Sequence, residues 1–154
     1  MVSVPTEKRY EKHIETELNN LIDDGLQFHS KIHKKDDKWY DKNLCVVGGE
    51  FMTFLKESQP EKYENLFKKY GDSIDQKVLS RLNKEIESKG LIHVLRKGFN
   101  DVYGGNIKTV FFQPNSFLSE KYRDEKYLKN KFLLVRQLAY STNNNNSIDI
   151  GIFI

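Results

Sequence analysis

The chain has 154 residues, 38% of them hydrophobic, and its 25 Lys and Arg against 22 Asp and Glu give a net charge of +3. This length and composition suit one domain, residues 1–154, with an adequate core, and they argue against two domains. Charges of both signs are interspersed along the chain. The weak basicity therefore permits contact with nucleic acid but does not argue for it.

Cysteine usage and hydropathy bear on the compartment. The single cysteine, Cys45, excludes an internal disulfide framework and suits a reducing environment, and its apolar neighbours predict a buried, inert thiol. The N-terminus lacks the apolar segment of a signal peptide, and no stretch approaches the length of a membrane span. We expect a soluble, cytoplasmic protein.

The N-terminal half predicts helices. Residues 6–25 place apolar side chains at helical spacing, with Thr6 as a cap and Gly25 as the stop. Residues 26–47 mix polar and apolar side chains without a sustained period, which indicates short strands or loops. By periodicity, proline and glycine signals, further helices are expected at 50–58, 60–71 and 73–90.

After Gly90 the sequence favours strands. Residues 91–99, 106–114 and 131–141 are rich in β-branched and aromatic side chains and are separated by turn signals, so the C-terminal third should be mostly sheet. Residues 131–140 are apolar on both faces apart from "RQ", which indicates an interior strand. The polar "STNNNN" then predicts an antiparallel hairpin to the last strand, 147–154. The fold class is mixed α+β.

The last strand, "SIDIGIFI", contains one acid in an alternating apolar run. Four isoleucines should share one face, and Asp149 should lie on the other face beside Phe153. A carboxylate in a partly buried sheet is costly unless a partner, a metal or water takes up its charge. Asp149 is therefore a candidate functional residue.

Two histidines offer an alternative site. His29 and His33 stand four apart, as zinc ligands do on one face of a helix, and Asp36 and Asp37 lie close by. The segment is not convincingly helical and supplies no third ligand at a set distance. Exposed or hydrogen-bonded histidines are the preferred interpretation.

Two further patterns have simpler explanations. "GGNIKT", starting at Gly104, resembles a phosphate loop but lacks a glycine directly before Lys108 and precedes a strand instead of a helix, so a hairpin turn explains its glycines. Ser141 and His93 show no pattern of a nucleophile and its base. Neither pattern supports an enzymatic site.

The remaining candidates are acids. Glu11 and Glu15 on the first helix are four apart and share a face, whereas Glu17 lies about 200° round the helix from Glu15. A carboxylate on a central strand that faces one from a packed helix can hold a divalent cation through oxygen ligands, as at sites that cleave phosphodiesters. Because most helix-surface glutamates are simply solvated, a structural interpretation stays open.

Five segments form a joint pattern in chain order: "IETELNNLIDDGL", "FMTFLKESQPEKYENL", "GLIHVLRKGF", "YLKNKFLLVRQLAYS" and "SIDIGIFI". Together they resemble successive elements of the N-terminal nuclease region of type I restriction enzyme R subunits. The likeness covers residues 11–154. It implies the fold of restriction endonucleases with a D…ExK signature, a mixed sheet flanked by helices.

The resemblance also implies a metal site. In the family, a strand aspartate and a glutamate on the next strand coordinate Mg²⁺, and a nearby lysine assists the attacking water. Asp149 matches the strand aspartate, and Glu15, or alternatively Glu11, corresponds to the first-helix acid that often joins such sites. This chain ends before the strand that carries Glu-x-Lys, so we expect a truncated, incomplete restriction-endonuclease-like fold that is inactive alone.

For the parent protein, the resemblance implies ATP-dependent, Mg²⁺-dependent cleavage of foreign double-stranded DNA in a restriction-modification system. ATP would bind in helicase-like motor domains outside these residues, and the partners would be methyltransferase and specificity subunits, with no membrane. The alternative is a non-catalytic α/β DNA-binding or protein-docking module in which Asp149 is a structural acid.

Overall fold

The computed structural model describes residues 6–21, 26–34, 37–113 and 120–154. Its helices are α1 (Glu7–Leu21), α2 (Gly48–Ser58), α3 (Pro60–Tyr70), α4 (Ile74–Lys89), α5 (Leu91–Lys97) and α6 (Glu120–Glu125), with short 3-10 turns η1 (Gly71–Ser73) and η2 (Tyr127–Lys129). Its strands are β1 (Gln27–Ile32), β2 (Phe99–Asp101), β3 (Gly105–Ile107), β4 (Lys131–Ala139) and β5 (Ser147–Phe153).

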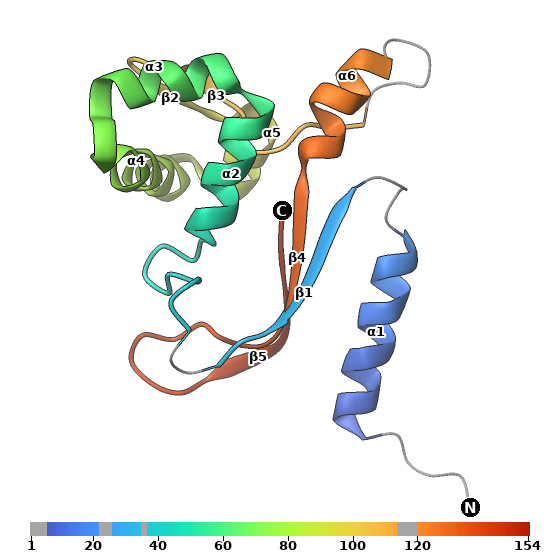
Figure 1. The fold of residues 1–154 in the computed structure, drawn as a ribbon. Helices are drawn as coiled ribbons and strands as arrows, with labels where there is room; N and C mark the ends of the chain where they lie inside the picture. The colour runs from blue at the N-terminus through green and yellow to red at the C-terminus, as the bar shows by residue number, and fades with distance from the viewer. Residues whose placement is uncertain (1–5, 22–25, 35–36, 114–119) are drawn as a thin grey trace, which may run out of the picture.

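A mixed three-stranded sheet forms one half of the molecule, in the order β1-β4-β5. Strand β4 lies in the middle, parallel to β1 and antiparallel to β5. Helices α2 to α5 and the β2-β3 hairpin form the other half, and α1 lies on the opposite side of the sheet from them (Figure 1). The predicted α+β class, the interior strand and the C-terminal hairpin are confirmed.

Two apolar clusters hold these halves. In the helical half, α2, α3, α4, α5 and the hairpin meet around fully buried side chains, among them Leu55, Leu66 and Val78. A smaller cluster covers one face of the sheet, where Tyr40 and Val47 pack on Leu133, Val135 and Leu138 of β4. Among the side chains of α1 that the structure describes, none belongs to either cluster, and polar contacts of Glu11 and Glu15 join this helix to β4.

The predicted helices agree with the structure within a few residues where the structure describes them, and the predicted stop of the first helix at Gly25 lies outside the described residues. The prediction for the segment after Gly90 is wrong, because residues 91–97 form helix α5 and not a strand. Val94 is buried in the helical cluster. Side chains from a later segment donate hydrogen bonds to carbonyl oxygens of α5: the Thr109 hydroxyl to the carbonyl of Val94 (3.1 Å) and the Lys108 ammonium to the carbonyl of Lys97 (3.1 Å). Tertiary packing thus overrides the β-propensity of this segment.

The sequence also predicts a strand at 106–114, but of its described residues, 106–113, only the first two belong to β3 and the others are irregular. A buried asparagine replaces the missing strand partner. The Asn130 side chain accepts from the backbone N–H of Phe111 (2.9 Å) and donates to the carbonyl of Phe111 (2.6 Å). A side-chain amide can satisfy both backbone groups in this way, and no ladder is then required.

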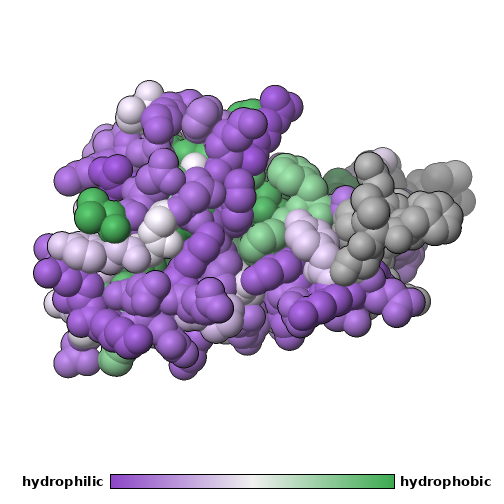
Figure 2. Space-filling model, turned by 90° about the horizontal axis from the view of Figure 1, so that it is seen from above, coloured by the Kyte–Doolittle hydropathy of each residue, from purple (hydrophilic) through white to green (hydrophobic). Residues whose placement is uncertain are grey.

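In the view of Figure 2 the surface is mainly hydrophilic, and the largest group of apolar residues lies near the middle of the molecule. Among the residues that the structure describes, no helix has the length and hydropathy needed to cross a membrane.

Candidate metal centre between helix α1 and strand β5

One face of α1 carries a row of acids. Glu7, Glu11 and Glu15 follow each other at intervals of four, which places all three on the same side of the helix. Glu17 is exposed and lies off this row. Helix α1 lies beside the sheet (Figure 1), and the contacts of Glu11 and Glu15 with β4 show that this face of the helix is turned toward it.

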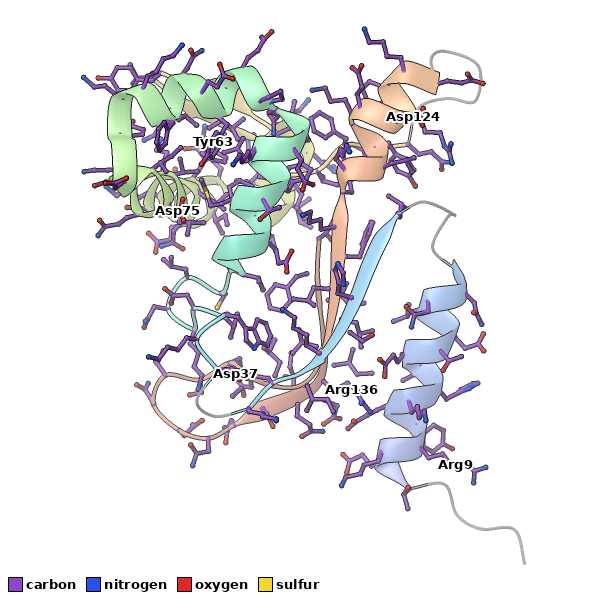
Figure 3. All side chains as sticks on the ribbon, viewed as in Figure 1. Arg9, Asp37, Tyr63, Asp75, Asp124 and Arg136 are labelled. Carbon is purple, nitrogen blue, oxygen red and sulfur yellow. The ribbon has the colours of Figure 1, made fainter. Side chains whose placement is uncertain are left out.

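Two adjacent residues of β4 bind this row. Arg136 forms an ion pair with Glu15, with 3.4 Å between Nε and Oε2, and Figure 3 shows Arg136 between the sheet and α1. The side-chain amide of Gln137 donates to Oε1 of Glu11 at 2.7 Å. Glu11 is only 5% exposed, so this hydrogen bond fixes the orientation of a buried carboxylate.

The remaining acids come together next to this contact. Glu7, Glu11 and Asp149 each offer a carboxylate oxygen, and these three oxygens lie within 4.8 Å of one another. In the described parts of the chain, no ion pair joins any of the three to a lysine or arginine. The described residues therefore give this group of carboxylates no counter-ion, and a bound cation would offset its negative charge.

The register of the hairpin explains how Asp149 reaches this position. Arg136 pairs with Ile150 and Leu138 pairs with Ile148, so Asp149 stands opposite Gln137. Two residues that face each other across β4 and β5 thus approach the same glutamate of α1. The antiparallel pairing brings the end of the chain to its first helix.

The structure brings together two of the three acids predicted from sequence, Glu11 and Asp149, and adds Glu7. Glu15 lies apart from this group in its ion pair with Arg136. Sequence reasoning missed Glu7, although its spacing of four from Glu11 was the signal that could have found it.

The environment of Asp149 differs from the expectation. Asp149 is exposed, not partly buried, and β5 is the edge strand of the sheet as described, not a central strand. The four-isoleucine face is also poorly covered, since Ile148 is 43% and Ile152 54% exposed, whereas Gly151 is buried on the other side. An exposed carboxylate keeps its hydration, so no desolvation cost demands a partner for it.

The alternative sites predicted from sequence are not assembled. His29 lies exposed on β1, and His33 is buried just after it, with its Nδ1 accepting the backbone N–H of Ala139 at 3.0 Å. Burial lowers the pKa of His33. No group of three metal-ligating side chains in the described residues includes either histidine, and Asp36 lies outside those residues.

Cys45 is exposed, so the prediction of a buried thiol is wrong. It occupies a turn with φ of 52°, and its Sγ donates to the carbonyl of Lys42 at 3.4 Å. The apolar run around it does not form a strand, because residues 42–45 turn the chain back to a bridge between Asp41 and Val46.

The other two patterns have structural roles. The glycines of "GGNIKT" belong to the tight β2-β3 hairpin, as predicted. The hydroxyl of Ser141 accepts the backbone N–H groups of Asn143 and Asn144, both at 3.2 Å, and thereby stabilises the loop between β4 and β5.

A cavity of about 340 Å³ lies elsewhere, between the helical half and the sheet. Its lining is mainly apolar and includes Phe51, Phe54, Leu133 and Phe153. None of the clustered acids lines it.

No family model, curated protein or solved structure matches the chain.

Proposed function

We propose that this chain is the N-terminal part of the nuclease domain of a type I restriction enzyme R subunit, and that Glu7, Glu11 and Asp149 contribute to its Mg²⁺ site. The observation that carries the proposal is the meeting of Glu11 and Asp149, which the sequence had singled out from opposite ends of the chain. Magnesium prefers oxygen ligands and is usually held by one or two carboxylates together with waters and substrate phosphate.

The spacing of the three oxygens fits such an ion. Mg–O distances of 2.0–2.1 Å in an octahedron put ligand oxygens about 3 to 4 Å apart. The three oxygens lie within 4.8 Å of one another, so small side-chain rotations bring them into range. Glu11 would be the fixed ligand, since Gln137 holds it, while the exposed Glu7 and Asp149 would adjust.

Bound there, the metal would neutralise charge on the scissile phosphate and lower the pKa of a bound water. The residues of this chain would position that chemistry: Gln137 orients Glu11, and the Arg136–Glu15 ion pair attaches α1 to the sheet. Neither the glutamate nor the lysine of a Glu-x-Lys strand follows Asp149 within these residues. We therefore expect these residues alone to leave DNA uncut.

In the parent protein, the centre would cleave foreign double-stranded DNA. ATP-driven motor domains would move the DNA, and methyltransferase and specificity subunits would select the site. The alternative, a module in which Asp149 is a hydrogen-bonded structural acid, has less support, because within the described residues no hydrogen bond or ion pair to the Asp149 side chain is found.

Calorimetric titration of the chain with Mn²⁺ tests the metal site. We expect Asp149→Asn, Glu11→Gln and Glu7→Gln each to weaken binding about tenfold or more, because each variant removes one of the three carboxylate ligands. Glu17→Gln on the other side of α1 and Asp124→Asn on α6 are matched controls that should bind as the wild type does. Equal binding by Asp149→Asn and Asp124→Asn would contradict the proposal.

Glu15→Gln separates the two first-helix acids. If Glu15 were a ligand, this variant would lose as much affinity as Glu11→Gln, whereas a role in the Arg136 ion pair predicts a smaller effect.

A nicking assay tests the rest of the proposal. Supercoiled DNA with Mg²⁺ should stay intact with these residues alone and be cut by a chain extended through a Glu-x-Lys strand within roughly twenty residues, the length of a turn and a strand. If the unextended chain nicked DNA and Asp149→Ala abolished this nicking, the Glu-x-Lys strand would not be needed for cleavage.

A further inference from the structure

The alternation of side chains between the two faces of β4 reverses at Gln137, a feature that we term the reversal. Leu133 and Val135 lie two apart and share a face, and an unbroken strand would put Leu138 on the opposite face. Leu138 nevertheless packs in the same cluster. Gln137 has φ of 56°, a left-handed conformation that is unfavourable for a residue with a side chain, and this single residue accounts for the reversal.

The reversal affects the acid centre, the group of Glu7, Glu11 and Asp149. Because the alternation is interrupted at Gln137, Leu138 packs in the core while the Gln137 amide donates to Glu11 at 2.7 Å. A strained residue at such a point persists only when its surroundings hold it in place.

His33 supplies that support. Its backbone N–H donates to the carbonyl of Arg136, the residue before Gln137, at 3.0 Å. Its Nδ1 accepts the backbone N–H of Ala139, two residues after Gln137, also at 3.0 Å. One residue thus holds both sides of the reversal.

The imidazole itself is closely packed. His33 is 7% exposed, and its ring meets those of Trp39 and Tyr40 edge-on at 5.5 and 5.6 Å. Because Nδ1 is an acceptor, the ring is neutral with its proton on Nε2. An imidazolium would offer a donor at both nitrogens and would lose the bond to Ala139.

We propose that His33 is a positioning residue for the acid centre: the neutral imidazole holds the reversal of β4 that aims Gln137 at Glu11. His33 touches none of the three acids and acts through Arg136, Ala139 and Gln137. The part of this proposal that concerns metal affinity rests on the proposed function, whereas the part that concerns Gln137 does not.

Two variants separate the acceptor from the packing. His33→Phe keeps a ring against Trp39 and Tyr40 but offers no acceptor, whereas His33→Asn keeps an acceptor near the position of Nδ1. The side-chain amide resonance of Gln137 in ¹H–¹⁵N spectra, assigned with Gln137→Leu, reports the bond to Glu11. We expect His33→Phe to shift this resonance to that of a free amide and His33→Asn to retain it.

Metal affinity is the second readout. We expect the Kd for Mn²⁺ to rise about tenfold or more in His33→Phe, as for other residues that orient a ligand, and by no more than about twofold in His33→Asn. An unchanged Gln137 resonance in His33→Phe overturns the proposal, and so does an equal loss in both variants. If the wild type binds no Mn²⁺, the proposed metal site fails, while the Gln137 resonance still decides the role of His33.

Should His33→Phe not fold, a pH titration of the wild-type chain decides. Protonation of His33, followed at its ring Cε1–H, should change the Gln137 resonance in parallel. Asp37 and Lys42 face the imidazole with opposite effects, Asp37 favouring and Lys42 opposing its protonation. A Gln137 resonance that stays constant while His33 titrates overturns the proposal.

Discussion

Replacing Gln137 by glycine and by alanine tests the strained turn in β4 directly. Gln137→Ala keeps the left-handed backbone but removes the hydrogen bond to Glu11, whereas Gln137→Gly removes the same bond and also the steric cost of φ at 56°. The two variants differ from each other only in the presence of Cβ. Their difference in stability therefore measures the strain.

The magnitudes follow from the contacts. A hydrogen bond to a charged group contributes about 1.5 kcal/mol at the low end of its range, which applies because the Gln137 side chain is exposed. Glycine is favoured over alanine by about 1 kcal/mol in a left-handed conformation. We expect Gln137→Ala to lose about 1.5 kcal/mol of unfolding free energy and Gln137→Gly only about 0.5 kcal/mol.

Urea denaturation followed by circular dichroism measures both values. Lys84 is exposed in the middle of α4, where glycine should instead be about 1 kcal/mol less stable than alanine, so Lys84→Ala and Lys84→Gly provide a control with the opposite order. If glycine were no more stable than alanine at position 137, the strained turn and its role in aiming Gln137 would be refuted.

Two further predictions concern His33 and Gly98. Burial lowers the pKa of His33 below its ordinary value of 6.5, so the unfolded chain binds a proton more readily than the folded chain does. The contribution of His33 to the unfolding free energy should therefore be fully present above pH 6.5 and be lost as the pH falls through the lowered pKa. Denaturation curves from pH 7.5 to 5 measure this dependence, and His33→Asn should remove it. Gly98 has φ of 75°, and an added Cβ would lie 2.1 Å from the carbonyl oxygen of Ile107, so Gly98→Ala should cost about 3 kcal/mol or more in urea. Gly49 on α2 has open space around it, so Gly49→Ala should be neutral or stabilising, and equal effects at the two glycines would contradict the steric argument.

Local patterns predicted much of the fold. The helices at α1 to α4 follow from apolar spacing with proline and glycine at their ends, and the β4-β5 hairpin follows from two apolar runs around "STNNNN". These features depend on neighbours in the chain. Helix α5 does not, because Val94 is buried in a cluster formed with other helices and the donors to the last carbonyls of α5, Lys108 and Thr109, follow the β2-β3 hairpin.

The candidate site divides in the same way. The amino-acid sequence by itself determined that one face of α1 carries Glu11 and Glu15, since helical spacing fixes which side chains share a face, and that Asp149 is an isolated acid in an apolar strand. Only the tertiary structure decided which acids meet. The hairpin register and the left-handed Gln137 bring Asp149 close to Glu11 and Glu7. The ion pair with Arg136 holds Glu15 apart from them. Contacts between distant segments depend on packing that no local spacing encodes.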